Sequence, residues 1–558
     1  MKRLSFILVF IIFSLISCVP VNGLWGGQGE ESMLYTQDPA PPGSEPASGS
    51  HPASNTTALA DHQLLLWVSS AVPPALLNGT TSWQCARTDD AYSADLVLDV
   101  QTETTSDASP SSTWVYTLVA PFPTVADGVT ADELRRAWVG EPAGPFGALP
   151  LWMDGTTLAA MTSVLGEPAT GSVVVVDTGD LLEDAWTGRP SWGIVPFEEL
   201  DPRWKVLAID GQSPIHRDFQ QESYLLKVVF SLQSPTADAT AFRLPASNRD
   251  PSRMTVLVMT GVTALVRATA HAMELNGILF PARDIRDWLV DADLTHISNE
   301  IPFAEDCPYP DPSFGMRPFC SDPRYIGLME DIGTDIVELT GNHFQDWGSA
   351  ATLMTIDMYD QRGWLHYGGG SDLEQARQAV VVESNGNRLA FIGCNTVGPD
   401  YAWATETQPG AASCDFPWMQ AEVSRLKQEG YLPIVTFQHN EYYTLTLHVE
   451  QQVHFRSMID AGAVIVSGSQ SHTPQGVEFF STGFIHYGLG NLFFDQMDDL
   501  NTRQEFIDRH VFYNGRHIST ELLTAMLEDY ARPRPMTAEE RQVLLSEAFA
   551  AGTWTTWP

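Results

Sequence analysis

In the second half of the chain, short apolar runs alternate with helical stretches, and several of these runs end at a group of polar residues. The runs cover residues 255–260, 292–297, 335–339, 388–393, 433–438, 463–467 and 483–487. Strand-like runs of this length between helical segments are typical of an α/β fold. Because such folds build their sites at the carboxyl ends of the strands, we expect the functional residues to gather at one edge.

Four polar groups follow these runs, and their side chains are suited to a metal ion. The groups are Asn299-Glu300, Gly341-Asn342-His343, the stretch from Gln438 to Glu441, and the stretch from Gly468 to His472. Carboxylate, amide oxygen and imidazole are donors for zinc, manganese or iron. A histidine alone is more often an ordinary hydrogen-bonded residue, but the four groups together favour a metal site at a hydrolytic centre.

Three longer motifs in this region carry a resemblance to a known family. They are LTGNHFQDWG at 339–348, IDAGAVIVSGSQSH at 459–472 and YGLGNLFFD at 487–495. In this order they resemble the bacterial poly-γ-glutamate capsule-synthesis proteins, the CapA family, over residues 255–495. The resemblance implies a C-terminal calcineurin-like metallophosphoesterase fold, an αββα sandwich.

The resemblance also implies roles for individual residues. It places metal ligands at Glu300, Asn342, His439 and His472, and a general acid at His343, whose loop Asp346 would orient. Arg267 and Asn299 would bind an anionic substrate. The chemistry would be metal-assisted attack on a phosphorus centre while His343 protonates the leaving oxygen.

One departure from the family pattern concerns the metal. Val262 stands where the family has a metal-binding aspartate, and valine offers no lone pair. Ser469 and Gln470 stand where histidine is common in calcineurin-like enzymes. Two readings therefore remain open: a site for a single ion of manganese, zinc or iron, or a polymer-binding domain with a vestigial site.

The first half of the chain also has an α/β pattern, over residues 61–245. WVYTLVAPFPTVADG at 114–128 and WGIVPFEELDPRWKVLAIDG at 192–211 resemble the type 2 periplasmic solute-binding fold. We expect helices after Thr130, which opens a capping box, and over 155–165. Either the turn at Ser69-Ser70 receives an anionic ligand, or this domain has none.

The N-terminus reads as an export signal. Lys2 and Arg3 precede an apolar stretch from Leu4 to Ile16 that is too short for an ordinary spanning helix. Leu15-Ile16-Ser17-Cys18 matches the bacterial lipobox, which predicts lipidation of Cys18. The alternative is a plain signal peptide or anchor with a chance cysteine. We expect an extracytoplasmic lipoprotein held at a membrane.

Composition separates the remaining segments and limits the partners. We expect a signal peptide over 1–18, a disordered tether over 19–60, the solute-binding-like domain over 61–245, the CapA-type domain over 254–530 and a helical tail over 531–558. A formal net charge of -39 would repel nucleic acid. In an oxidising compartment, Cys307 with Cys320 and Cys394 with Cys414 would form disulfides, and Cys85 would stay free.

Two functions follow from the sequence. The first is a CapA-family lipoprotein that acts in synthesis, anchoring or remodelling of an anionic surface polymer, with metal-dependent hydrolysis of that polymer or a phosphoester left open. A membrane-embedded polymer synthase would be its partner. The second is a non-catalytic ligand-binding or scaffold lipoprotein with a degenerate phosphoesterase site.

Overall fold

A computed structural model describes residues 63–78, 80, 83–102, 109–234, 239–313 and 319–554. Cys18, the signal peptide and the tether lie outside the described residues. Gln63–Pro558 form one compact unit. Within the described ranges, no helix combines the length and the apolar character that a bilayer span needs.

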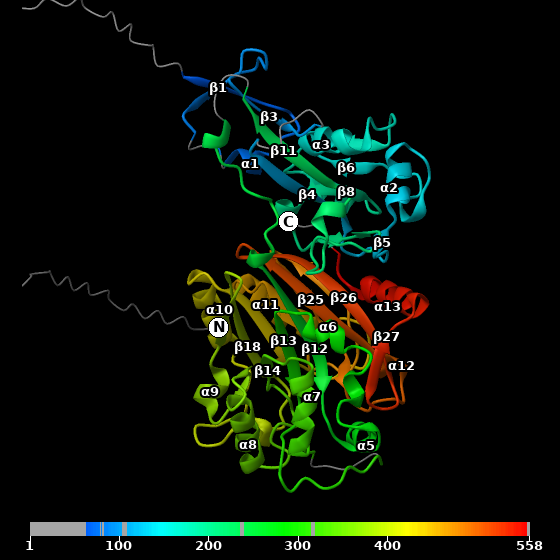
Figure 1. Cartoon of the computed structure of the whole chain (residues 1–558). Coiled ribbons are helices and arrows are strands. Elements are labelled where there is room, and N and C mark those ends of the chain that lie inside the picture. The colour runs from blue at the N-terminus through cyan, green and yellow to red at the C-terminus, as the bar shows by residue number, and fades with distance from the viewer. Residues whose placement is uncertain are drawn as a thin grey trace, which may run out of the picture. The chain divides into compact units, whose positions relative to one another are not determined.

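The first half of the unit contains a nine-stranded mixed sheet with the order β2-β1-β3-β11-β4-β8-β6-β7, and β9 pairs with β4 (Figure 1). The capping box at Thr130 and the helix over 155–165 are confirmed. The elements are β1 Leu64–Val68, α1 Pro74–Asn78, β2 Cys85–Arg87, β3 Leu96–Val100, β4 Ser111–Pro121, β5 Gly128–Val129, α2 Ala131–Trp138, β6 Leu151–Met153, α3 Gly155–Leu165, β7 Val173–Val175, α4 Leu181–Thr187, β8 Trp192–Pro196, β9 Trp204–Val206, β10 Ala208–Ile209 and β11 Lys227–Gln233.

The second half is built on two mixed sheets. One has the order β15-β14-β13-β12-β25-β26-β27, with β24 beside β12, and the other has the order β17-β18-β20-β21-β23-β22. The strands are β12 Met254–Thr263, β13 Leu294–Asn299, β14 Ile336–Glu338, β15 Leu365–Tyr367, β16 Gly369–Gly370, β17 Val380–Ser384, β18 Asn387–Asn395, β19 Gly410–Ala411, β20 Leu432–Gln438, β21 Ile465–Ser467, β22 Val477–Phe480, β23 Gly483–His486, β24 Asn491–Phe493, β25 Gln504–Tyr513, β26 Arg516–Glu528 and β27 Arg532–Pro535.

Three apolar clusters show how the layers pack. Met259 of the first sheet and Phe391 of the second lie in one cluster, so the two sheets pack face to face. The outer face of the first sheet packs against α5, α6, α7 and α8, and that of the second against α9, α10 and α11. These layers form the αββα sandwich predicted for a calcineurin-like fold. The helices are α5 Arg267–Asn276, α6 Arg286–Val290, α7 Ile326–Asp331, α8 Ser349–Asp360, α9 Leu373–Arg377, α10 Phe416–Gln428, α11 Val449–Ala461, α12 Leu500–Arg503 and α13 Ala538–Ala551.

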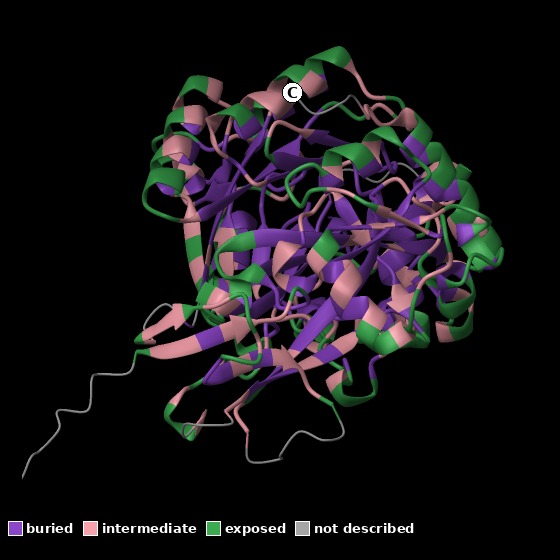
Figure 2. Ribbon diagram, turned by 90° about the horizontal axis from the view of Figure 1, so that it is seen from above, coloured by how far each residue is buried: buried purple, intermediate pink, exposed green. Residues whose placement is uncertain are grey.

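Burial follows this arrangement. Figure 2 shows that the inner strands are almost wholly buried, whereas the helices alternate between buried and exposed residues. Every residue of β12 and of β25 is buried. Strands covered on both faces account for the long apolar runs of the sequence.

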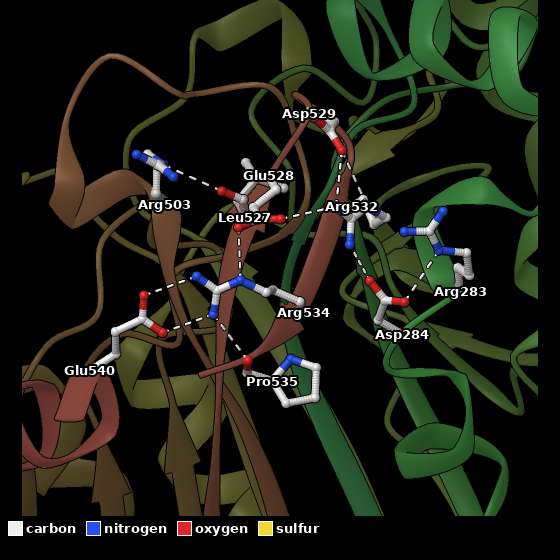
Figure 3. A network of polar contacts seen from close by, with 10 residues as sticks. All are labelled: Arg283, Asp284, Arg503, Leu527, Glu528, Asp529, Arg532, Arg534, Pro535 and Glu540. Atoms are coloured by element: carbon white, nitrogen blue, oxygen red, sulfur yellow. Dashed lines mark hydrogen bonds and ion pairs between the residues drawn. The ribbon is translucent and has the colours of Figure 1, made fainter. Parts of the chain in front are cut away.

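The end of the chain is held by a polar network that Figure 3 shows around the hairpin of β26 and β27. Arg534 donates to Glu528 and to Glu540, and Glu540 also accepts from the backbone N–H of Thr537. Thr537 in turn caps α13. The helix predicted for the tail therefore starts only at Ala538, and Arg532–Pro535 form a strand before it.

The two halves share buried aromatic contacts. Phe122, which follows β4, packs edge-on against Phe479, Phe484 and Phe549 of the sandwich and its C-terminal helix. Tyr513 of β25 similarly packs against Phe197 of the first half. These contacts join the two halves into one core.

Candidate metal and phosphoesterase-like site

The ends of four parallel strands bring the polar groups together. β13 and β14 belong to one sheet, and β20 and β21 belong to the other. Close backbone approach at the rim requires glycine. A Cβ at Gly341 would lie 2.5 Å from the carbonyl oxygen of Glu300, and one at Gly468 would lie 2.0 Å from that of Tyr487. Any larger residue would force these turns apart.

Glu300, Glu441 and His472 form the centre of the site. Their ligand atoms all lie within 4.8 Å of one another. Nε2 of His472 is 3.8 Å from Oε1 of Glu300 and 3.6 Å from Oε1 of Glu441. Two carboxylates and an imidazole at these distances match the donors that zinc, manganese and iron prefer.

His472 is oriented by a residue of the YGLGNLFFD motif. Its Nδ1 lies 2.8 Å from Oδ1 of Asn491, which can only accept, so Nδ1 is the donor and Nε2 faces the carboxylates. Burial opposes the charge on this ring, but Glu441 and Glu300 outweigh it and raise the pKa of His472 to about 9. The ring is therefore positively charged between two acids when it has no other cation beside it.

The carboxylates differ in their hydrogen bonding. Burial raises the pKa of Glu300, and its Oε1 has no hydrogen-bond partner among the described residues. Glu441 accepts from the Tyr443 hydroxyl at 2.8 Å. Burial raises the pKa of Glu441, but its contacts with His472 and Tyr443 outweigh this effect and lower it to about 2. A bound cation would therefore supply the partner that this buried oxygen of Glu300 lacks.

Asn342 and His439 lie beside this centre in different ways. Nδ2 of Asn342 is 3.4 Å from Oε1 of Glu441, and its buried Oδ1 has no partner in the described part of the chain. His439 turns its Nε2 to Nδ1 of His454, at 3.1 Å. Burial, with the two neighbouring histidines, lowers the pKa of His439 to about 4, so the ring is neutral. Asn342 is thus adjacent to the triad, whereas one nitrogen of His439 is already engaged elsewhere.

His343 is held by Asp346. Nδ1 of His343 lies 2.7 Å from Oδ2 of Asp346, and the ring packs against Phe319 with 4.6 Å between centroids. Burial raises the pKa of Asp346, but hydrogen bonds from His343, Phe319 and Tyr401 lower it below the usual value. An ionised carboxylate on Nδ1 fixes the ring and leaves Nε2 as the reactive nitrogen.

An apolar cluster occupies the place where a second cation would need a ligand. We call it the Val262 cluster, and it contains Val262, Ala264, Val266, Ile301, Phe319 and Phe494. Ser469 donates to Glu338 in the interior instead of facing the triad. The side chain of Gln470 is buried. The donor set therefore fits one cation better than two.

The two residues predicted to bind substrate have other partners. The Asn299 side chain is fully buried, and its Nδ2 donates to the carbonyl of Ile301 and to the Tyr359 hydroxyl of α8. The prediction for Asn299 is wrong, because neighbouring residues of a strand face opposite sides and Asn299 faces the helices.

Arg267 is also buried and pairs with Asp495, which additionally accepts from the backbone N–H of Ala268 at 2.9 Å. Its guanidinium lies over the rings of Phe319 and Phe494. This arginine joins the start of α5 to the end of the YGLGNLFFD motif, and substrate binding by Arg267 has no support in these contacts.

The sequence did not assign three residues that build the site: Glu441 as a donor, Asn491 as the partner of His472, and Tyr401 as a partner of Asp346. Glu441 stands in the polar group after β20, so its position after a strand end was an available signal. Asn491 and Tyr401 reach the site from distant segments, and only the fold reveals them.

In the first half, the predicted anion turn is occupied by its own chain. The Ser69 hydroxyl accepts from the backbone N–H of Ala71, and the helix that follows, α1, has only five residues. So short a helix offers little dipole for an anion.

Comparison with known proteins agrees with the motifs. Residues 245–496 match the family described as bacterial capsule synthesis protein PGA_cap. The match lies in the second half of the chain and includes the three motifs that carry the resemblance. A capsule biosynthesis protein CapA of Bacillus anthracis is 23% identical over 299 residues, which cover 53% of this chain and 72% of the relative. Other curated relatives are matched over half of their own length.

Solved structures resemble each half of this chain only distantly. A 5'-nucleotidase precursor of Thermus thermophilus is 16% identical, with a TM-score of 0.30, and the match covers 52% of this chain and 58% of that chain. An ABC-type phosphate transport receptor of Vibrio cholerae is 12% identical, with a TM-score of 0.27, over 32% of this chain and 90% of that chain.

Proposed function

We propose that the protein is an extracytoplasmic lipoprotein that acts in capsule or poly-γ-glutamate synthesis, and that its site is a hydrolytic centre for a single divalent cation. The match of residues 245–496 to the capsule synthesis family supports the first part. The geometry of Glu300, Glu441 and His472 supports the second, because three ligand groups converge and one buried carboxylate oxygen accepts no hydrogen bond from the described residues.

Glu300, Glu441 and His472 would hold the cation, and Asn342 lies next to them. Bound there, a divalent cation would act as a Lewis acid that polarises an oxygen of the substrate. His343 would protonate the leaving oxygen from Nε2, because Asp346 already holds Nδ1. The Val262 cluster would exclude water from one side of the site.

The negative charge of the chain means that an anionic substrate would need the bound cation to attract it. The chain carries a formal net charge of -39, so an anionic polymer meets repulsion over most of the surface. A cation at the triad offers local attraction for a carboxylate or phosphate group. We propose that the substrate is an anionic polymer segment or a phosphoester, and that a membrane-embedded synthase is the partner.

The disulfides support export. Cys307 is bonded to Cys320 and Cys394 to Cys414, as predicted, and Cys85 is free. Such bonds persist in oxidising compartments and are rare in the cytosol. Together with the lipobox at Cys18, they favour the outer side of a membrane.

The test uses the compact unit Gln63–Pro558, which we call the ectodomain. It is titrated with manganese and with zinc by calorimetry and is then assayed on generic phosphoesters. We expect about one ion per chain, with affinity at least about tenfold lower in Glu300→Gln, Glu441→Gln and His472→Ala. Glu505→Gln is the matched control, because Glu505 is a buried acid with a pKa raised far above its usual value, so its isosteric amide removes no charge.

Equal metal affinity in the parent and in the three variants would refute the metal site. Metal binding without turnover of any phosphoester would instead leave a binding or scaffold protein as the function.

A further inference from the structure

Asp346 collects hydrogen bonds from three separate segments of the chain. Its Oδ2 accepts from Nδ1 of His343 at 2.7 Å and from the backbone N–H of Phe319 at 3.1 Å. Its Oδ1 accepts from the Tyr401 hydroxyl at 2.9 Å. The orientation of His343 therefore depends on two loops that are distant from it in the sequence.

Each of these loops is closed by a disulfide. Phe319 directly precedes Cys320, which is bonded to Cys307. Tyr401 lies between Cys394 and Cys414, which are bonded to each other. Because a crosslink removes conformational freedom from the segment that it closes, both loops are restrained next to Asp346.

The Phe319 side chain also covers the His343 imidazole. The Phe319 ring lies 4.6 Å from the His343 ring, and the Arg267 guanidinium lies 5.0 Å from the centroid of the same phenyl ring. His343 is only 9% exposed. If Phe319 moved, the imidazole would lose its cover, and Asp346 would lose the hydrogen bond from the backbone N–H of Phe319.

The Tyr401 loop is tied to the strand-end turn of the site through Asn395, next to Cys394. Oδ1 of Asn395 accepts from the backbone N–H groups of Val397 and Gly398, at 2.9 and 2.7 Å. Its Nδ2 donates to the carbonyl of Thr340 at 2.9 Å, two residues before Asn342. The Cys394–Cys414 disulfide thus restrains a loop that already contacts the site twice, through Asn395 at Thr340 and through Tyr401 at Asp346.

We propose that Phe319 and Tyr401 are positioning residues that set His343 through Asp346, and that the two disulfides keep them in place, so that the site is assembled only in the oxidised protein. The inference rests on the proposed function in one respect, the role of His343 as proton donor. Opening each disulfide takes two electrons and two protons from a dithiol, which becomes a cyclic disulfide.

The first experiment measures the accessibility of the His343 imidazole and does not depend on enzymatic activity. Histidines of the metal-free ectodomain are carbethoxylated with diethyl pyrocarbonate, and the rate at each residue is measured by peptide mass spectrometry. His216, on the other half of the chain with 31% of its side chain exposed, serves as the internal reference. We expect Cys307→Ser/Cys320→Ser to raise the relative rate at His343 by about tenfold, since a locally opened site reacts through its exposed population.

Cys85→Ser is the matched control, because Cys85 is a free thiol, and it should leave the rate at His343 unchanged. If the double variant does not fold, dithiothreitol-treated parent protein with its thiols counted by alkylation gives the same reading. An unchanged rate at His343 after opening of both disulfides would overturn the proposal, whether or not the protein is an enzyme.

The second experiment uses any phosphoester that the parent turns over. Tyr401→Phe removes one hydroxyl, so we expect kcat to fall about tenfold with KM unchanged, since general acid catalysis depends on alignment of the acid. Tyr92→Phe, at a fully exposed tyrosine of the first half, is the control. A raised KM with unchanged kcat would assign Tyr401 to substrate binding and overturn its positioning role. If the parent has no turnover, the proposed function fails, and the labelling experiment still decides the positioning.

Discussion

Val262 and Phe494 belong to one buried apolar cluster, at the place where a calcineurin-like centre would need an anionic ligand. Val262 is fully buried. A carboxylate at this position would have apolar neighbours on the Phe494 side and no counter-charge unless a cation were close. The same position therefore tests both the packing and the metal chemistry.

Val262→Asp should destabilise the metal-free protein by about 3 kcal/mol or more, because it buries an unpaired acid. Manganese or zinc should restore at least half of that loss if the pocket still accepts a second ion. The measurement is urea unfolding with and without metal. Val262→Asn, similar in shape but neutral, should respond much less to metal, and an identical metal response in both variants would contradict the prediction.

Acid should destabilise the protein through His517, which is buried beside His510 and Phe512 of β25, with Phe484 of β23 facing its ring. Burial lowers the pKa of His517 to about 4, against weaker opposing effects of the hydrogen bond to the Ser519 carbonyl and of Asp201. The unfolded chain therefore binds the proton first, and stability that is present above pH 6.5 is lost as the pH falls toward 4.

At pH 5 this loss amounts to about 2 kcal/mol for one histidine that stays neutral in the folded protein. His517→Gln should flatten the dependence of the unfolding free energy between pH 7 and pH 5 by that amount relative to the parent. Parallel curves for the parent and His517→Gln would contradict the expectation.

Phe122 should couple the stability of the two halves. Its ring packs against three aromatic rings of the sandwich, so Phe122→Ala should lower the free energy of unfolding by about 3–5 kcal/mol. Calorimetry should then resolve two transitions instead of one. Phe242→Ala removes a half-buried ring that packs against Trp83 within the first half, and it should destabilise without splitting the transition.

Membrane attachment depends on Cys18 in our prediction from the sequence. Cys18→Ala should move the protein from the membrane fraction to the soluble fraction of the cells that export it, because the lipid group covalently attached to Cys18 would be the anchor. Cys85→Ala is the control. A chain that stays membrane-bound after Cys18→Ala would point to an uncleaved apolar anchor instead.

Local patterns of residues predicted the local structure correctly. The capping box at Thr130 and both disulfides are confirmed. Asn385-Gly386, a residue pair typical of two-residue hairpin turns, joins β17 to β18 with positive φ at both residues. In each case the signal depends on residues close together in the chain. The rim of the site was also predictable, because parallel strands share one edge.

Two long strands, β25 and β26, were not predicted. β25 and β26 carry polar residues that face the space between the sheets, including Asp508, which pairs with His486 at 2.7 Å, and His510, which pairs with Thr520 at 2.8 Å. These buried polar residues hide the apolar alternation by which strands are recognised. The partner of Arg267, Asp495, was missed because it comes from a segment far away in the sequence, and the partner of His439, His454, because it lies on the next helix, α11.

The backbone of the rim has a further consequence. Gly261, Gly341 and Gly468 each press against a neighbouring main chain, so the turns that carry the donor side chains are shaped without those side chains. A lineage can then exchange aspartate for valine at 262, or histidine for glutamine at 470, and still inherit the architecture. In such a protein, the metal-binding side chains can change without loss of the fold.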